Sequence, residues 1–136
     1  MTTPERGTGT VPVPLVWTRS ESGRAGEQTT EAFSTQLPDD YAFFEGHFPG
    51  YPILAGAVQL QELVLPCLRQ VRSDETRLAG LSSVKFPARI QPGDRLQVSL
   101  RFTDGSPRVR FEIRRGEALC THGQLELATA DPGGAP

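Results

Sequence analysis

Apolar and polar residues alternate strictly along the second half of the chain. The apolar positions of residues 96–102 and 109–113 fall at every second residue, and arginines or other polar residues fill the positions between them. This period of two predicts strands with one buried face. Turn-forming residues at 103–107 and 115–117 separate these two strands from each other and from a last strand through residues 119–127. The resulting meander has one apolar side, which needs a second layer to cover it.

A different period governs residues 57–71, whose apolar positions recur three and four residues apart and predict a helix. The predicted apolar stripe consists of Leu60, Leu63, Val64, Cys67, Leu68 and Val71. Pro66 lacks the N–H that would bond to the carbonyl of Glu62, so we expect a kink or an end of the helix near that turn. One central helix is available to cover the sheet, which predicts an α+β fold with an antiparallel β-sheet wrapped around one long helix.

The N-terminal third is less regular. Residues 11–17 combine prolines with β-branched residues and predict an edge strand or a strand entrance, with Trp17 as its anchor. Residues 20–28 are polar and contain two glycines, so we expect a loop there. Residues 29–37 are expected to return as a second strand that ends at Pro38.

Composition limits the class of protein. With 136 residues, 37% of them hydrophobic, the chain is expected to form a single domain over residues 11–129, flanked by flexible tails at 1–10 and 130–136. The net charge is −2 and the basic residues are scattered, which argues against nucleic acid as a partner. Neither a long apolar run nor the pattern of a signal peptide is found, so the expectation is a soluble cytoplasmic protein that does not use a membrane.

The two cysteines, Cys67 and Cys120, lack the spacing of metal ligands. We expect them to be buried thiols rather than a disulfide, which removes zinc binding and redox chemistry from consideration.

Candidate chemistry concentrates in residues 46–56, which run directly into the predicted helix. His47 lies there among Pro and Gly residues that fix unusual backbone angles. The loop leads to a helix N-terminus, where N–H groups have no intrahelical partner. This arrangement can present a base beside an oxyanion site, although a histidine that only caps or packs in a loop is the simpler alternative.

Residues 47–56, with Phe43 and Phe44 before them, resemble the signature of the 3-hydroxyacyl-acyl-carrier-protein dehydratases of the hotdog fold. Residues 85–86 and 92–94 also match positions of that family. Residues 58–60 resemble its aryl-polyene and polyketide-like branch.

The resemblance implies roles for individual residues. The histidine at the position of His47 removes the C2 proton of a 3-hydroxyacyl thioester, because an imidazole with a pKa near ~6.5 can take and return a proton. The glycine matching Gly56 lends its backbone N–H to the thioester carbonyl, where the helix dipole helps to stabilise the enolate. The product would be a trans-2-enoyl thioester, and no metal, nucleotide or flavin cofactor is implied.

One position departs from the family. Its second catalytic residue is an Asp or Glu fourteen positions after the histidine, on the helix of the partner subunit, and Gln61 stands there. Glu62 is adjacent, but one step along an α-helix turns a side chain by about 100° and should point it away. Three outcomes remain open: slower dehydration by His47 with Gln61 only as a hydrogen-bonding group, a heterodimer whose other subunit supplies the acid, or a non-catalytic subunit or hotdog thioester hydrolase.

The resemblance also suggests binding residues. The acyl chain would lie beside the central helix of a homodimer or a heterodimer, lined by Phe44, Tyr51, Val58, Leu60 and Leu65, for which packing in the core is the simpler alternative. The acyl carrier protein that brings the substrate would contact Lys85 and Arg89. The outward arginines of the meander could also meet an acidic partner or be a solvated face.

Overall fold

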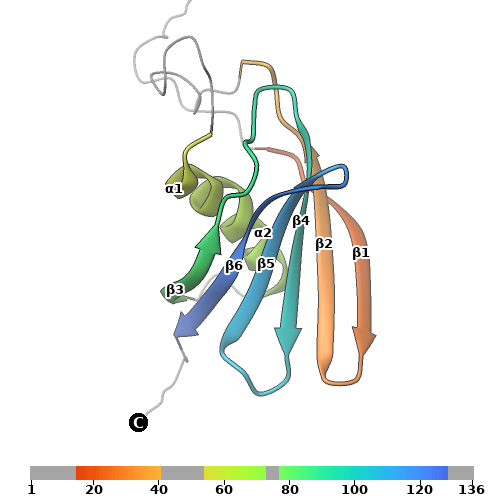
Figure 1. The fold of residues 1–136 in the computed structure, drawn as a ribbon. Coiled ribbons are helices and arrows are strands. Elements are labelled where there is room, and N and C mark those ends of the chain that lie inside the picture. The colour runs from red at the N-terminus through yellow and green to blue at the C-terminus, as the bar shows by residue number, and fades with distance from the viewer. Residues whose placement is uncertain (1–14, 41–53, 73–76, 129–136) are drawn as a thin grey trace, which may run out of the picture.

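The computed structural model describes residues 15–40, 54–72 and 77–128. These residues form one six-stranded antiparallel sheet with a helix on one of its faces (Figure 1). The order of strands across the sheet is β1-β2-β4-β5-β6-β3. The strands are β1 (Thr18–Ala25), β2 (Gln28–Gln36), β3 (Arg77–Lys85), β4 (Arg95–Thr103), β5 (Arg108–Arg115) and β6 (Ala118–Ala128).

The helix is continuous over residues 56–71 but changes its winding twice. It consists of α1 (Gly56–Val58), the π-helical segment η2 (Gln59–Val64) and α2 (Leu65–Val71). The prediction of an irregularity near Pro66 is confirmed in place, but the helix neither ends nor breaks there. Pro66 lies just after the π-helical segment, and the wider turns there accommodate a residue that has no N–H to donate to the preceding turn.

The core lies between the helix and the concave face of the sheet. The alternation in β4 and β5 is confirmed, because every second residue of both strands is buried. The fully or almost fully buried apolar side chains include Phe33, Leu63, Val64, Cys67, Leu68, Leu96, Val98, Leu100, Phe111, Ile113 and Leu125. The predicted α+β architecture, a sheet around one helix, is therefore correct.

The prediction of a loop at residues 20–28 is wrong, because β1 occupies most of that stretch. All eight residues of β1 are exposed, so the strand has no apolar alternation that sequence patterns could detect. It is held by main-chain pairing with β2, from Thr18 opposite Ser34 to Ala25 opposite Gln28. Trp17 precedes this strand and packs against the core, as expected for an anchor.

The two outer strands of the sheet differ in character. β1 presents polar and glycine residues, whereas β3 carries Leu78 and Leu81, whose side chains are 38% and 43% exposed. An outer strand with exposed apolar side chains is a surface suited to pairing with another chain.

Cys67 and Cys120 are free and buried, as expected. The predicted tails and residues 11–14 lie outside the described residues. No helix in the described part of the chain is long and apolar enough to cross a membrane.

Candidate functional site

The loop that carries His47, Phe44 and Tyr51 lies outside the described residues, and the described part of the candidate site is the start of the helix with the segments that contact it. Its downstream end is fixed at Leu54, which is buried and whose N–H donates to the carbonyl of Ile90 at 3.0 Å. Two residues later the helix begins at Gly56. The chain therefore enters the helix from a point anchored to the segment between β3 and β4.

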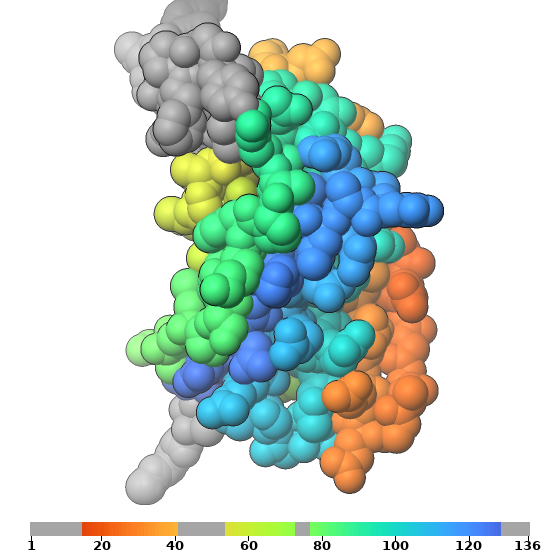
Figure 2. Space-filling model, in the orientation of Figure 1, coloured from red at the N-terminus to blue at the C-terminus, as the bar shows by residue number. Residues whose placement is uncertain are grey.

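The start of the helix is covered by an aromatic ring. A Cβ atom placed on Gly56 would lie 2.7 Å from Cζ of Phe86, closer than real side chains approach one another. Phe86 follows β3 and is 49% exposed. In the space-filling view, the segment around it (green) lies directly beside the start of the helix (yellow) (Figure 2). Glycine at position 56 thus allows this close packing, which a larger residue would disturb by displacing the ring, and the ring covers one side of the first helical turn.

A buried amide locks the same turn to the sheet. Gln59 is only 3% exposed, and its Nε2 donates to the carbonyl of Leu54 at 3.1 Å. Its Oε1 accepts a hydrogen bond from Oγ1 of Thr121, a fully buried residue of β6. Both ends of the amide are therefore satisfied, as a buried polar group requires. The network joins Leu54, two residues before the helix, to the first helical turn and to the sheet.

The predicted second catalytic position lies within the π-helical segment. Gln61 is exposed on the helix surface and Glu62 is partly buried. A π-helix has more residues per turn than an α-helix, so the angle between these neighbours is smaller than the value assumed for a regular helix. Single π-turns inside helices occur frequently at functional sites.

The proposed lining residues and the proposed carrier-protein contacts differ in their exposure. Val58, Leu60 and Leu65 are partly buried and pack against the main core. Lys85 is exposed at the end of β3, directly before the ring of Phe86. Arg89 is also exposed, and its carbonyl accepts a hydrogen bond from Nη1 of Arg115 at 2.7 Å.

The segment 92–94 that matched the family is a tight turn with a structural task. Gly93 has a φ of +82°, a conformation that favours glycine. Asp94 accepts a bond from the N–H of Gln91 at 2.8 Å through its carboxylate, and from the N–H of Leu37 at 2.9 Å through its carbonyl. The turn therefore ties the end of β2 to the start of β4, close to where the chain leaves for the loop of His47.

What these groups can do follows from their chemistry. The first N–H groups of a helix carry partial positive charge and lack intrahelical partners, so they can stabilise negative charge that develops on an oxygen. An apolar ring on one side strengthens such an interaction by excluding water. Within residues 15–40, 54–72 and 77–128, no three His, Cys, Asp or Glu side chains gather closely enough to bind a metal ion.

Comparison with known proteins identifies relatives. A family model described as ApeI-like, ApeI dehydratase, matches residues 23–124. The 3-hydroxyacyl-[acyl-carrier-protein] dehydratase FabZ of Bacillus cereus is 32% identical over 85 residues, which cover 58% of this chain and 56% of the relative. The chain thus spans just over half the length of that relative. The FabZ of Natranaerobius thermophilus is 33% identical over 102 residues, 65% of this chain and 69% of the relative.

A solved structure supports the same fold. The dehydratase heterocomplex ApeI:P from Xenorhabdus doucetiae contains a chain that matches with a TM-score of 0.69 at 18% identity, covering 88% of this chain and 100% of that chain. At this level of identity the match establishes the architecture, which is the hotdog fold.

Proposed function

The chain belongs to the ApeI-like dehydratase family, and from that premise we propose that it removes water from 3-hydroxyacyl thioesters carried by an acyl carrier protein. The product is the trans-2-enoyl thioester. The reaction would serve the biosynthesis of fatty acids or of polyketides and polyenes. The observation that carries the proposal is the start of the helix, where Gly56 stands under the ring of Phe86 and is held in place by the Gln59 network.

The proposed reaction needs a base and a group that stabilises the enolate. His47 takes the proton from C2, and the electron pair of that bond moves toward the thioester carbonyl to give an enolate. The N–H of Gly56 donates to the enolate oxygen. The electrons then return to form the C2=C3 double bond while the hydroxyl on C3 leaves with a proton as water. The ring of Phe86 keeps bulk water from the first helical turn throughout.

Gln61 decides how the leaving hydroxyl is helped. An amide can hydrogen-bond this hydroxyl but cannot give it a proton, so in a homodimer His47 returns the proton it took. General acid help is typically worth about 10²–10⁴-fold, and the homodimer should be slow by about that factor. In a heterodimer the second subunit supplies the acid. The dehydratase heterocomplex ApeI:P from Xenorhabdus doucetiae, which has a similar chain, supports this arrangement.

We place the dimer contact along β3. This strand forms one edge of the sheet, beside the start of the helix, and exposes Leu78 and Leu81. Antiparallel pairing of two such edges would cover both leucines and bring the exposed Gln61 face of one helix toward the partner.

Lys85 and Arg89, which are exposed near this edge, are the proposed contacts of the acidic carrier protein.

The direct experiment loads a 3-hydroxyacyl group onto a carrier protein and follows loss of water by mass spectrometry. We expect His47→Ala to abolish dehydration and Gln61→Asp to raise it by at least about tenfold, because an acid is then restored. Gln70→Asp is the matched control, since it makes the same change at an exposed position further along the same helix. An equal response of Gln61→Asp and Gln70→Asp would contradict the assigned role.

Two further measurements separate the alternatives. Release of free acid from a saturated thioester would identify a hydrolase instead of a dehydratase. Turnover that appears only after a second dehydratase-like subunit is added would identify the heterodimer.

The β3 contact has its own test. Leu81→Lys should shift the protein from dimer to monomer in sedimentation velocity, and an unchanged dimer would refute the β3 contact.

A further inference from the structure

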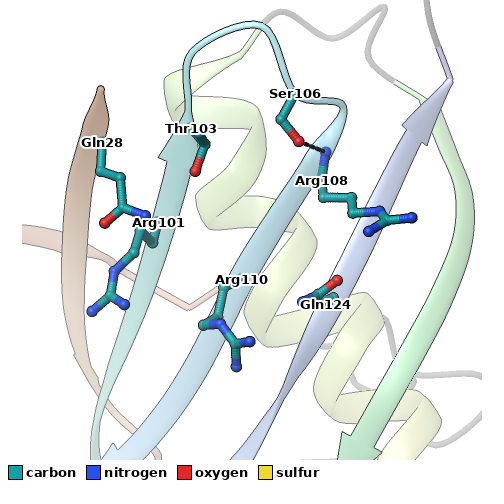
Figure 3. Close-up of a pocket in the computed structure, with 7 residues that line it drawn as sticks. All are labelled: Gln28, Arg101, Thr103, Ser106, Arg108, Arg110 and Gln124. Carbon is teal, nitrogen blue, oxygen red and sulfur yellow. Dashed lines mark hydrogen bonds between the residues drawn. The ribbon is translucent and has the colours of Figure 1, made fainter. Parts of the chain in front are cut away.

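A hollow of about 280 Å³ lies on the sheet face that points away from the helix, and none of its lining residues belongs to the proposed active site. Three arginines line it: Arg101 on β4, and Arg108 and Arg110 on β5. Figure 3 looks onto this face, with the labelled side chains in front of the strands and the helix behind them. The apolar alternation of β4 and β5 explains the placement, because residues between the buried ones must point outward.

The pairing of the strands forces two positive charges together. Arg101 lies directly opposite Arg110 in the β4–β5 ladder. Residues opposite one another on neighbouring strands have Cβ atoms about 4.5–5.5 Å apart, and like charges in such positions destabilise a sheet. No ion pair to a carboxylate relieves either guanidinium within the part of the chain that the structure describes. Arg108 has only a long contact, 4.0 Å from its Nε to the carboxylate of Glu126.

The rest of the lining is neutral and rich in donors. Gln28 comes from β2 and Gln124 from β6, the strands next to β4 and β5 in the sheet, and both bring side-chain amides (Figure 3). Ser106 accepts a hydrogen bond from the N–H of Arg108 at 3.1 Å, which leaves its hydroxyl proton free to donate. A surface with three guanidinium groups, two amides and the hydroxyls of Thr103 and Ser106 matches a group that offers several acceptor oxygens and negative charge.

We propose that this hollow is a binding site for a phosphate-type oxyanion, either free inorganic phosphate or the phosphates of a nucleotide. The anion bridges Arg101 and Arg110 and removes the repulsion that the strand register builds into the sheet. Arg108 and the neutral donors complete its hydrogen bonds. The site is separate from the helix start, so its occupancy is independent of the proposed dehydration and can be tested without turnover.

The test measures the thermal unfolding midpoint (Tm) at low salt, with millimolar inorganic phosphate compared with potassium chloride at equal ionic strength. We expect Tm to rise by about 5 °C when phosphate reaches about ten times its dissociation constant. Arg110→Gln should raise Tm by about 1–3 °C in the absence of phosphate, because the opposed charges are gone, and should lose the response to phosphate. Arg101→Gln should behave in the same way.

Arg95→Gln is the matched control. Arg95 lies on β4 with the same outward phase as Arg101, six residues away and outside the hollow. It should keep the full response, which separates a site from the general stabilising effect of phosphate on folded proteins. Adenosine 3′,5′-bisphosphate tested in parallel distinguishes the sources, since a larger rise than with phosphate assigns the site to a nucleotide. No rise with either ligand, an equal rise in all variants, or a lower Tm of Arg110→Gln without phosphate would overturn the proposal.

Discussion

Replacing Gln59 tests whether the buried amide network holds the start of the helix. Gln59→Leu keeps nearly the same volume but removes both hydrogen bonds of the amide. The carbonyl of Leu54 and the hydroxyl of Thr121 then lose their partner in a region closed to water, since Leu54 is 1% exposed and Thr121 is fully buried. An unsatisfied buried polar group costs about 1–3 kcal/mol, so the variant should lose about 2–5 kcal/mol of unfolding free energy.

The sharper prediction concerns the double variant. Thr121→Val alone should cost about 1–3 kcal/mol, because it leaves Oε1 of Gln59 without a donor. Added to Gln59→Leu, the same change should instead recover about 1 kcal/mol, because it removes the hydroxyl that the first change left unpaired. The effect of Thr121→Val therefore reverses its sign between the two backgrounds.

Urea unfolding of the four proteins followed by circular dichroism measures these differences. For a chain of 136 residues, 1 kcal/mol corresponds to about 3.5 °C in Tm, so a thermal scan gives a second estimate. If Thr121→Val destabilises both backgrounds equally, the two side chains are not coupled and the reasoning fails. A neutral Gln59→Leu would refute it as well.

Two other predictions test the packing. In Gly123→Ala the new Cβ would lie 2.9 Å from Cγ2 of Val84 and 3.1 Å from the ring of Phe111, which is fully buried, so Tm should fall by about 3–10 °C. Gly80→Ala, whose new Cβ has its nearest neighbour at 4.0 Å, should change Tm by less than about 2 °C. Burial raises the pKa of both the Cys67 and the Cys120 thiol, so iodoacetamide at about pH 8 should alkylate neither in the folded protein and both after denaturation. Rapid alkylation of the native protein, or equal Tm changes for the two glycine variants, would contradict these arguments.

The elements with a strong apolar period could be predicted from the sequence, and the others could not. β4, β5 and the helix each bury one regular set of positions, so the pattern alone locates them. β1 has no buried face and owes its existence to pairing with β2, which depends on the whole sheet. The π-helical winding before Pro66 is equally invisible, because the spacing of apolar residues fits a regular helix almost as well.

The candidate site was only partly predictable for a related reason. Sequence reasoning selected Gly56 by resemblance, but the need for glycine beneath Phe86 comes from a contact between residues thirty positions apart. Gln59 was overlooked, although a signal was present. It lies four residues before Leu63 and thus in phase with the apolar stripe, where a polar side chain requires buried partners. Its partner Thr121 could be found only from the fold.

The unlike edges of the sheet set a limit on growth. If two copies pair through their β3 strands, which carry the exposed leucines, a twofold axis covers both of those sheet edges at once. The edges that remain outside belong to the eight-residue Thr18–Ala25 segment, whose charges, serines and glycine offer no large apolar side chain to a third copy. Such an assembly is self-limiting, and it stops at a closed pair instead of extending into a fibre.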